Sequence, residues 1–153
     1  MRKLLLLPFL LFALFACAEP NITGTWKLDR DASTGSPSVQ GASLLVITQS
    51  GDALTFDYYP LKNGQRGDLL QSDGYTTDGL EHPGYKTRTY VTYLQAYWRK
   101  KQLVTRTRAI MDPEGYQTFT NENHWSLSED GKTLTDKSSD GKKVVYSREP
   151  AAQ

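Results

Sequence analysis

The side chains best suited to chemistry in this 153-residue sequence are two histidines, one cysteine and a set of aspartates. His82 lies in a Pro-Gly turn, and His124 alternates with Trp125 in a predicted strand, so neither has a partner at metal-ligand spacing. Cys17 lies at the end of an apolar N-terminal run, where it is no nucleophile. Aspartates fall mainly in turns, where Asp makes local hydrogen bonds: Asp52, Asp73, Asp78, Asp130 and Asp140. The sequence also lacks a phosphate-binding glycine loop and a serine nucleophile elbow, so it predicts a non-enzymatic protein without a metal or cofactor.

Residues 1–17 form a separate segment that predicts export. Arg2 and Lys3 provide a positive start, and residues 4–15 form an apolar core too short to span a bilayer. Ala16-Cys17-Ala18 fits ordinary signal cleavage, whereas residues 14–17 resemble a bacterial lipobox in which Cys17 becomes lipidated. Cys17 is the sole cysteine, so an internal disulfide is ruled out. A sole cysteine at this position is what a lipid anchor would require. We expect a periplasmic protein or an outer-membrane lipoprotein of a bacterium.

The remaining chain is long enough for one domain, residues 18–149, followed by a short tail at residues 150–153. Without Arg2 and Lys3 the 18 basic residues fall to 16, against 17 acidic ones. This balance gives no reason to expect nucleic acid as a partner. Beyond the N-terminal segment, no apolar run is long enough to cross a membrane as a helix.

Alternating apolar residues and short turn signals predict β-strands along the whole exported chain. The first strand, residues 24–28, places Trp26 and Leu28 on one face. Asp73-Gly74 and residues 81–84 are typical of turns. Three hairpins have a predicted register, with Ile47 opposite Leu54 around Ser50-Gly51, Trp98 opposite Leu103 around Lys100-Lys101, and Leu127 opposite Leu134 around Asp130-Gly131. Eight or nine strands without a helical window favour a single antiparallel up-and-down β-barrel, whose closure removes exposed sheet edges.

Several of these strands share residue patterns with a known group of proteins. The patterns are Gly24-Thr25-Trp26-Lys27-Leu28, residues 47–54, Ala96-Tyr97-Trp98 with Leu103, and residues 125–135. In this order they resemble a family of exported bacterial proteins with a lipocalin-like β-barrel domain. Gly24-x-Trp26 also resembles the first signature of lipocalins, in which a late basic residue, here Arg148, packs over the tryptophan. The resemblance implies a lipocalin-like barrel and no particular lipocalin function.

The residues that are predicted to face the interior suggest a small-molecule site inside the barrel. It combines apolar rings with a few polar groups, namely Gln49, Phe56, Tyr58, Trp98, Asn121, Asn123 and Trp125. A mostly apolar cavity with few polar groups suits a small lipophilic ligand. Alternatively, these side chains fill the interior, because eight strands enclose only just enough room for them. Trp26, backed by Arg148, is predicted to close one end of the barrel rather than to contact a ligand.

A second hypothesis places an anionic partner on the outside of a filled barrel. Residues 82–111 contain seven basic residues and no acidic one. Tyr93 and Tyr97 share the predicted outer face with part of this basic set, from which we select Arg99, Lys100, Lys101, Arg106 and Arg108. Charge and cation–π contacts would let such a face bind lipid headgroups, polysaccharide or an acidic protein in the cell envelope. A solvated sheet face explains the same pattern, because Tyr has a high strand propensity.

Overall fold

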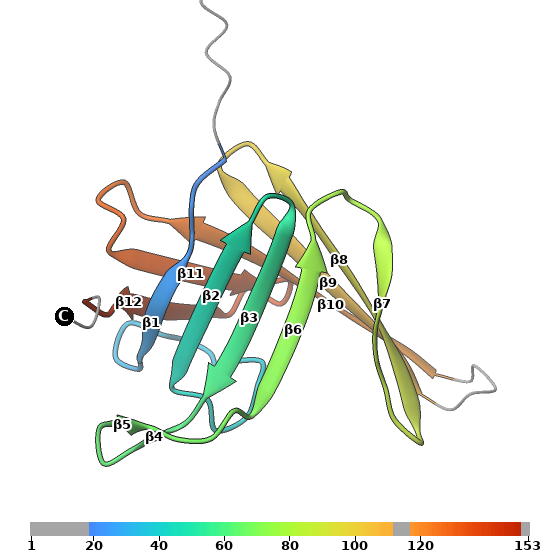
Figure 1. Ribbon diagram of the computed structural model, residues 1–153, viewed down its shortest axis with the longest axis horizontal. Helices are drawn as coiled ribbons and strands as arrows, with labels where there is room; N and C mark the ends of the chain where they lie inside the picture. The colour runs from blue at the N-terminus through green and yellow to red at the C-terminus, as the bar shows by residue number, and fades with distance from the viewer. Residues whose placement is uncertain (1–18, 112–116, 151–153) are drawn as a thin grey trace, which may run out of the picture.

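The protein folds as a nearly closed antiparallel β-barrel in the computed structural model, which describes residues 19–111 and 117–150 (Figure 1). Ten strands form one sheet in the order β6-β3-β2-β1-β12-β11-β10-β9-β8-β7, and β4 pairs with β5 separately. The strands are β1 Gly24–Asp29, β2 Leu44–Ser50, β3 Ala53–Tyr59, β4 Leu61–Lys62, β5 Gln65–Arg66, β6 Gln71–Thr76, β7 Glu81–Lys86, β8 Tyr90–Arg99, β9 Gln102–Met111, β10 Gln117–Leu127, β11 Thr133–Ser138 and β12 Lys143–Arg148. Within the described ranges, no helix is long and apolar enough to cross a membrane.

The antiparallel all-β architecture confirms the predicted fold class, but the predicted number of strands is too low. The main sheet has ten strands rather than eight or nine. Residues 81–84, predicted as a turn, lie within the additional strand β7, and the predicted Asp73-Gly74 turn lies within β6. β7 is at an edge of the sheet, where Pro83 is tolerated because an edge strand does not need every N–H for pairing.

Two of the three predicted hairpin registers are confirmed. Trp98 lies opposite Leu103, and Leu127 lies opposite Leu134. The third is wrong, because Ile47 lies opposite Phe56 and not opposite Leu54. There the two turn residues are Gly51 and Asp52 rather than Ser50 and Gly51, and Gly51 adopts the left-handed conformation with φ of 56°. The shift keeps the same alternation, so Ile47 remains buried.

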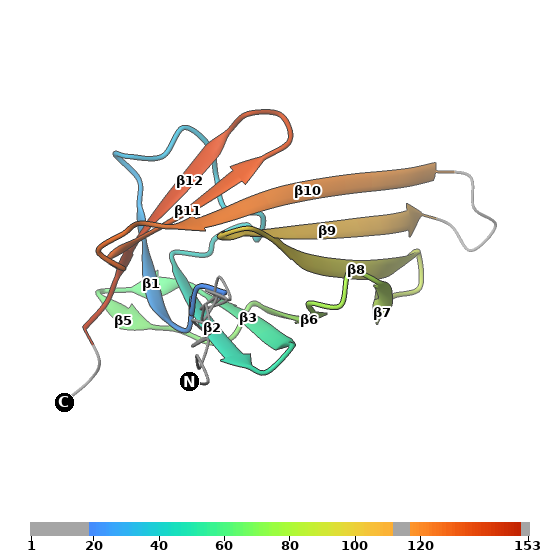
Figure 2. The ribbon, with the colours of Figure 1, turned by 90° about the horizontal axis from the view of Figure 1, so that it is seen from above.

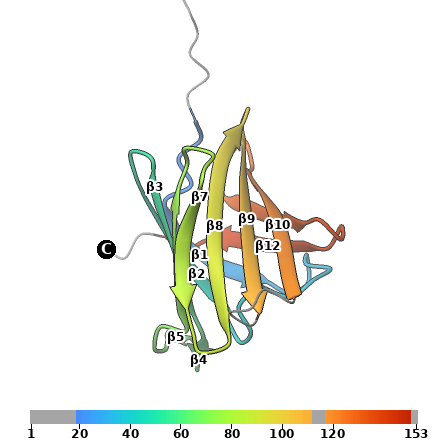
Figure 3. The same cartoon turned by 90° about the vertical axis from the view of Figure 1, so that its right-hand side faces the viewer.

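The two edge strands of the sheet, β6 and β7, lie on either side of the seam that closes the barrel (Figure 1), and Figure 3 shows β7 followed by β8, β9 and β10 on this side. Residues 77–80 connect these strands, and the Gly79 N–H donates to the Ala96 carbonyl at 3.0 Å. Across the same seam, the Tyr75 hydroxyl lies 3.4 Å from the Thr107 hydroxyl of β9. The seam is therefore held by contacts outside the regular strand ladder.

β8, β9 and β10 are the longest strands and extend past the rest of the barrel (Figure 2).

One end of the barrel is closed around Trp26, whose side chain is completely buried. The indole N–H donates to the Ile22 carbonyl at 3.0 Å, and the Arg148 guanidinium lies 4.2 Å from the ring centroid. Arg148 also donates to the carbonyls of Gly131 at 2.7 Å and Thr23 at 2.8 Å. A Cβ at Gly24 would lie 2.8 Å from an Arg148 nitrogen. The Gly-x-Trp pattern thus leaves room for the guanidinium over the indole.

We expect Arg148→Met to lower the free energy of unfolding by about 1 kcal/mol. Methionine keeps much of the side-chain length but loses the cation–π contact and the bonds to two carbonyls. Urea denaturation measures the change, with Lys143→Met on the same strand as the control. Equal denaturation midpoints for the two variants would contradict this role of Arg148.

Candidate functional site

A layer of aromatic side chains crosses the interior of the barrel. Phe56 of β3 lies between Tyr75 of β6 and Trp125 of β10, with ring centroids 5.5 Å and 5.1 Å away. Trp125 in turn stacks on Tyr146 of β12 at 6.4 Å. β3 and β10 are separated by four other strands in the sheet, so the contact between Phe56 and Trp125 spans the interior. The layer divides the barrel into two parts.

Inward-facing positions change from polar to apolar along the strands that meet this layer. The rows are Asn121, Asn123, Trp125 and Leu127 on β10; Thr107, Thr105 and Leu103 on β9; Ser138, Asp136 and Leu134 on β11; and Tyr58, Phe56 and Leu54 on β3. Because alternate residues of a strand face the same side, each row lies on one wall of the barrel. The apolar ends pack around Trp26 in the main core, whereas the polar ends surround open space.

Two adjoining cavities occupy the polar part of the barrel. The inner cavity has a volume of about 190 Å³ and the outer one about 660 Å³. Both are lined by Ser38, Asn121 and Asn123. The inner cavity is also lined by Tyr58, Gln71, Asp73, Tyr75, Tyr85, Thr105, Thr107 and Trp125. The outer cavity lies between residues 33–38 and the polar ends of β10, β11 and β12.

The segment between β1 and β2 covers this end and is fixed to β12. The N–H groups of Thr34 and Gly35 donate to the Lys143 carbonyl at 2.8 and 3.1 Å. The Val145 N–H donates to the Ser33 hydroxyl at 2.9 Å. Farther along the segment, Val39 packs into the core. These contacts hold residues 33–38 in place as one wall of the outer cavity.

Tyr85 reaches the inner cavity because β7 is irregular. The pairing of β7 with β8 shifts register between Pro83 and Lys86. The buried Thr92 hydroxyl accepts from the Tyr85 N–H at 2.8 Å and donates to the Tyr85 carbonyl at 3.0 Å. A Cβ at Gly84 would collide with this hydroxyl, so only glycine fits.

Asp136 is the most deeply buried acidic side chain among the residues that the structure describes, with 3% of its surface exposed. It lies opposite Trp125 on one side and Val144 on the other. The Asn123 side-chain amide donates to Oδ2 at 2.7 Å, whereas Oδ1 is shielded from solvent and has no hydrogen-bond partner. Burial raises the pKa of Asp136 to about 7, and the bond from Asn123 opposes this rise.

Asp73 contributes a second buried carboxyl group to the inner cavity, with 7% of its surface exposed. The Gln71 amide nitrogen lies 2.8 and 2.9 Å from its two oxygens. Burial raises the pKa of Asp73, although the bond from Gln71 opposes this. The pKa of Tyr75 is raised by burial first, then by the charge of Asp73 and less by that of Asp136. Tyr75 therefore lies close enough to both carboxyl groups for their charges to raise its pKa.

Most of the predicted interior residues lie at this site. Tyr58, Asn121 and Asn123 line the cavities, and Phe56 and Trp125 belong to the aromatic layer.

Two predicted interior residues lie elsewhere. The Gln49 side-chain oxygen accepts from the Ile22 N–H at 3.4 Å, at the end closed by Trp26. Trp98 is partly buried against the apolar core, and its indole N–H is buried without a partner.

Six residues of the site were not predicted from the sequence: Asp73, Asp136, Tyr75, Tyr85, Thr105 and Thr107. Asp136 could have been found, because the predicted pairing of Leu127 with Leu134 places Asp136 opposite Trp125. Asp73 was hidden by the following Gly74, since Asp-Gly is typical of turns.

The basic outer face is partly neutralised by acidic neighbours. Arg106 forms an ion pair with Glu122 at 2.6 Å, and Arg108 forms one with Glu81 at 2.7 Å while lying 4.5 Å from the Tyr93 ring centroid.

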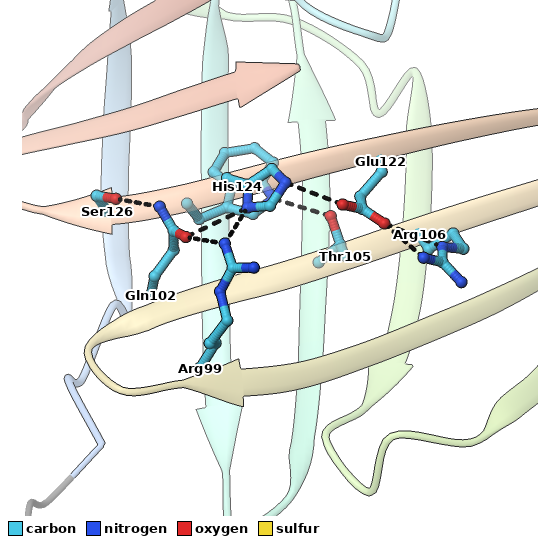
Figure 4. Close-up of polar contacts among 8 residues, drawn as sticks. Arg99, Gln102, Thr105, Arg106, Glu122, His124 and Ser126 are labelled. Carbon is cyan, nitrogen blue, oxygen red and sulfur yellow. Dashed lines mark hydrogen bonds and ion pairs between the residues drawn. The ribbon is translucent and has the colours of Figure 1, made fainter. Parts of the chain in front are cut away.

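The remaining predicted cations of this face lie near the β8–β9 turn. Arg99 donates to Gln102 at 2.9 Å and lies 3.2 Å from His124, whose other nitrogen lies 3.0 Å from Glu122 (Figure 4). Lys100 and Lys101 form the exposed turn that precedes β9.

The fold and the site together define a β-barrel with a polar interior cavity. No protein-family model matches the chain, and no curated protein sequence matches it. The lipocalin-like family therefore remains a prediction from the residue patterns. Within residues 19–111 and 117–150, no three His, Cys, Asp or Glu side chains are grouped to hold a metal ion. Cys17 lies outside the described residues.

We expect Asp136→Asn to stabilise the protein at pH 8 and to have little effect below pH 4. The folded protein keeps the carboxyl proton up to about pH 7, whereas the unfolded chain loses it near the usual value of 3.8. Stability that depends on this group is therefore present below pH 4 and is lost as the pH rises to about 7. At pH 8 the gain in free energy of unfolding is about 4 kcal/mol.

Urea denaturation between pH 4 and pH 8 measures this difference. Asp52→Asn, which removes a carboxylate in the exposed β2–β3 turn, is the control. Parallel pH profiles for the wild type and Asp136→Asn would contradict the assignment of the raised pKa to Asp136.

Proposed function

We propose that the protein is an exported, non-catalytic β-barrel that binds a small molecule in the cavities above the aromatic layer. The observation that carries this proposal is the buried Asp136 carboxyl group, which lines a cavity and has an oxygen without a partner. Leaving a buried polar atom without a hydrogen bond destabilises a folded protein by about 1–3 kcal/mol. A ligand in the outer cavity that supplies a donor would remove this cost once the carboxyl group turns towards it.

The lining of the cavities bears on the kind of molecule that would bind. The residue pattern predicts a small lipophilic ligand, but the walls consist largely of hydroxyl, amide and carboxyl groups. Apolar surface is provided by the rings of the aromatic layer. This mixture favours a small molecule with a polar group and an apolar part over a purely lipophilic one.

The N-terminal segment supports export and, through Cys17, attachment to a membrane. The Ile22 carbonyl accepts the hydrogen bond from the Trp26 indole, so the first described residues lie at the closed end of the barrel. A lipid at Cys17 would then hold the closed end towards the membrane and leave the cavities at the other end. This arrangement would allow a ligand to enter from the solvent side.

The basic outer face gives weaker support for an anionic partner. Glu122 and Glu81 compensate the charges of Arg106 and Arg108, so part of the predicted set is already engaged. We therefore place the function inside the barrel.

We expect a panel of small aromatic molecules, each with one amine, alcohol, amide or carboxylate, to include a binder that changes tryptophan fluorescence in a saturable way. Trp125 lines the inner cavity, whereas Trp26 lies at the closed end. Asn121→Phe fills the cavity entrance from an exposed position and should abolish the binding.

Thr120→Phe is the matched control, because the neighbouring residue of β10 faces the outside of the barrel and should leave binding unchanged. If no member of the panel binds, or if Asn121→Phe and the wild type bind equally, the proposed function is wrong.

We expect Cys17→Ser to abolish incorporation of a labelled fatty acid and to release the protein from membranes in a bacterial host. Thioether lipidation requires the cysteine sulfur, and serine keeps the size without it. Labelling of the intact cells, followed by membrane fractionation, gives both readouts. A labelled Cys17→Ser variant, or an unlabelled wild type, would contradict the anchor.

A further inference from the structure

We infer that the ligand of this barrel is a small amine bound as an ammonium ion by Asp136, an inference that rests on the proposed function. The charged groups that line the two cavities are mainly acidic. Asp73 and Asp136 are both more than nine-tenths buried. Lys142 is the one basic residue among the described lining residues, and it forms an ion pair with Asp140 at 2.8 Å. The deep carboxyl groups therefore have no cation of their own, and a positive ligand would supply it.

Hydrogen bonding distinguishes the two carboxyl groups. Both oxygens of Asp73 lie within hydrogen-bond distance of Gln71. Asp136 has Asn123 on Oδ2, whereas its Oδ1 accepts no hydrogen bond and is shielded from solvent, so a ligand contacts Oδ1 when the carboxyl group turns towards the outer cavity that Asp136 lines. An ammonium group carries three donors and no acceptor, so it matches an acceptor-rich site, whereas an anion would be repelled. Asp136 is thus the direct contact, and Asp73 adds negative charge from the opposite wall.

The indole ring of Trp125, which lines the inner cavity, provides the second half of the site. Trp125 lies directly opposite Asp136 across the β10–β11 pair, and Tyr146 stacks on Trp125. The face of an indole or phenol ring attracts a nearby cation, and its apolar surface packs against a hydrocarbon group. A neutral molecule of the same shape gains the packing but neither the charge contact nor the cation–π contact. The site therefore favours an amine with an aromatic body.

The neighbours of Asp136 determine how such binding depends on pH. Asn123 faces it from β10, Tyr146 from β12 and Tyr75 from β6, while Lys142 lies at the outer cavity in its pair with Asp140. Because the pKa of Asp136 is about 7, the free protein at neutral pH holds a proton on this group part of the time. An arriving ammonium ion displaces that proton to the solvent, since the carboxylate form is the one that pairs with it. Binding of a cation therefore strengthens between pH 6 and pH 8.

A matched series of three probes tests this inference by titration calorimetry. Phenethylamine, 2-phenylethanol and 3-phenylpropionate share a phenyl ring on a short chain and differ in charge. We expect phenethylamine to bind about tenfold more tightly than 2-phenylethanol at pH 8, and 3-phenylpropionate to bind most weakly. The affinity for phenethylamine should fall about tenfold from pH 8 to pH 6, while that for 2-phenylethanol stays constant.

Variants of the two carboxyl groups identify the contact. Asp136→Asn should weaken phenethylamine binding about tenfold, remove its pH dependence and leave 2-phenylethanol binding unchanged. Asp73→Asn should produce a smaller loss, and Asp52→Asn, in the exposed turn, none.

The outcomes separate the inference from the proposed function on which it rests. If 2-phenylethanol or 3-phenylpropionate binds as tightly as phenethylamine and Asn121→Phe abolishes that binding, the cavity binds ligands but the preference for a cation is wrong. Phenethylamine binding that survives Asp136→Asn with its pH dependence intact also overturns the inference. If none of the three probes nor any other small molecule binds, the proposed function fails as well.

Discussion

The contact between Phe56 and Trp125 is the interaction on which the interior of this barrel depends. It joins strands on opposite walls, β3 and β10, and Tyr75 and Tyr146 extend it on either side. Large rings fill the width of a small barrel in a way that aliphatic side chains do not. Because the aromatic layer separates the cavities from the apolar core around Trp26, the cavities can remain hollow without opening the core to water.

The two ends of the barrel consequently meet different physical demands. At the closed end, Trp26 is fully buried, its indole N–H is satisfied by Ile22, and Arg148 covers the ring. At the other end, Asp136 keeps an unpaired oxygen in a site where burial disfavours its charged form. The polar groups around Trp26 are therefore satisfied. The carboxyl groups whose charged form is disfavoured by burial lie beside the cavities, as is expected where a bound partner completes their interactions.

The sequence predicted local pairing better than it predicted the site. The hairpin from Trp98 to Leu103 could be aligned because a two-residue turn joins two long alternating strands. The register of Ile47 was wrong because Ser50-Gly51 and Gly51-Asp52 are both plausible turns and differ by one residue. Asp73 was assigned to a turn, since nothing local shows that an Asp-Gly pair lies within a strand. The correct pairing of Leu127 with Leu134 also places Asp136 opposite Trp125. The burial of Asp136 could not be predicted in this way, because it depends on the opposite wall of the barrel.

The polar rows above the aromatic layer are not a requirement of the fold. Strand pairing is set by the backbone, and an inward position accepts Leu or Val as readily as Asp or Asn, as Leu134 and Leu103 show two positions deeper on β11 and β9. Extending those apolar rows through Asp136 and Thr105 would reduce two costs, the empty volume and the buried carboxyl group. The chain instead places carboxyl, amide and hydroxyl groups at these positions and supports them with Asn123, Gln71 and Tyr75. A hollow with this chemistry is consistent with the proposed binding of a molecule that pairs with these polar groups.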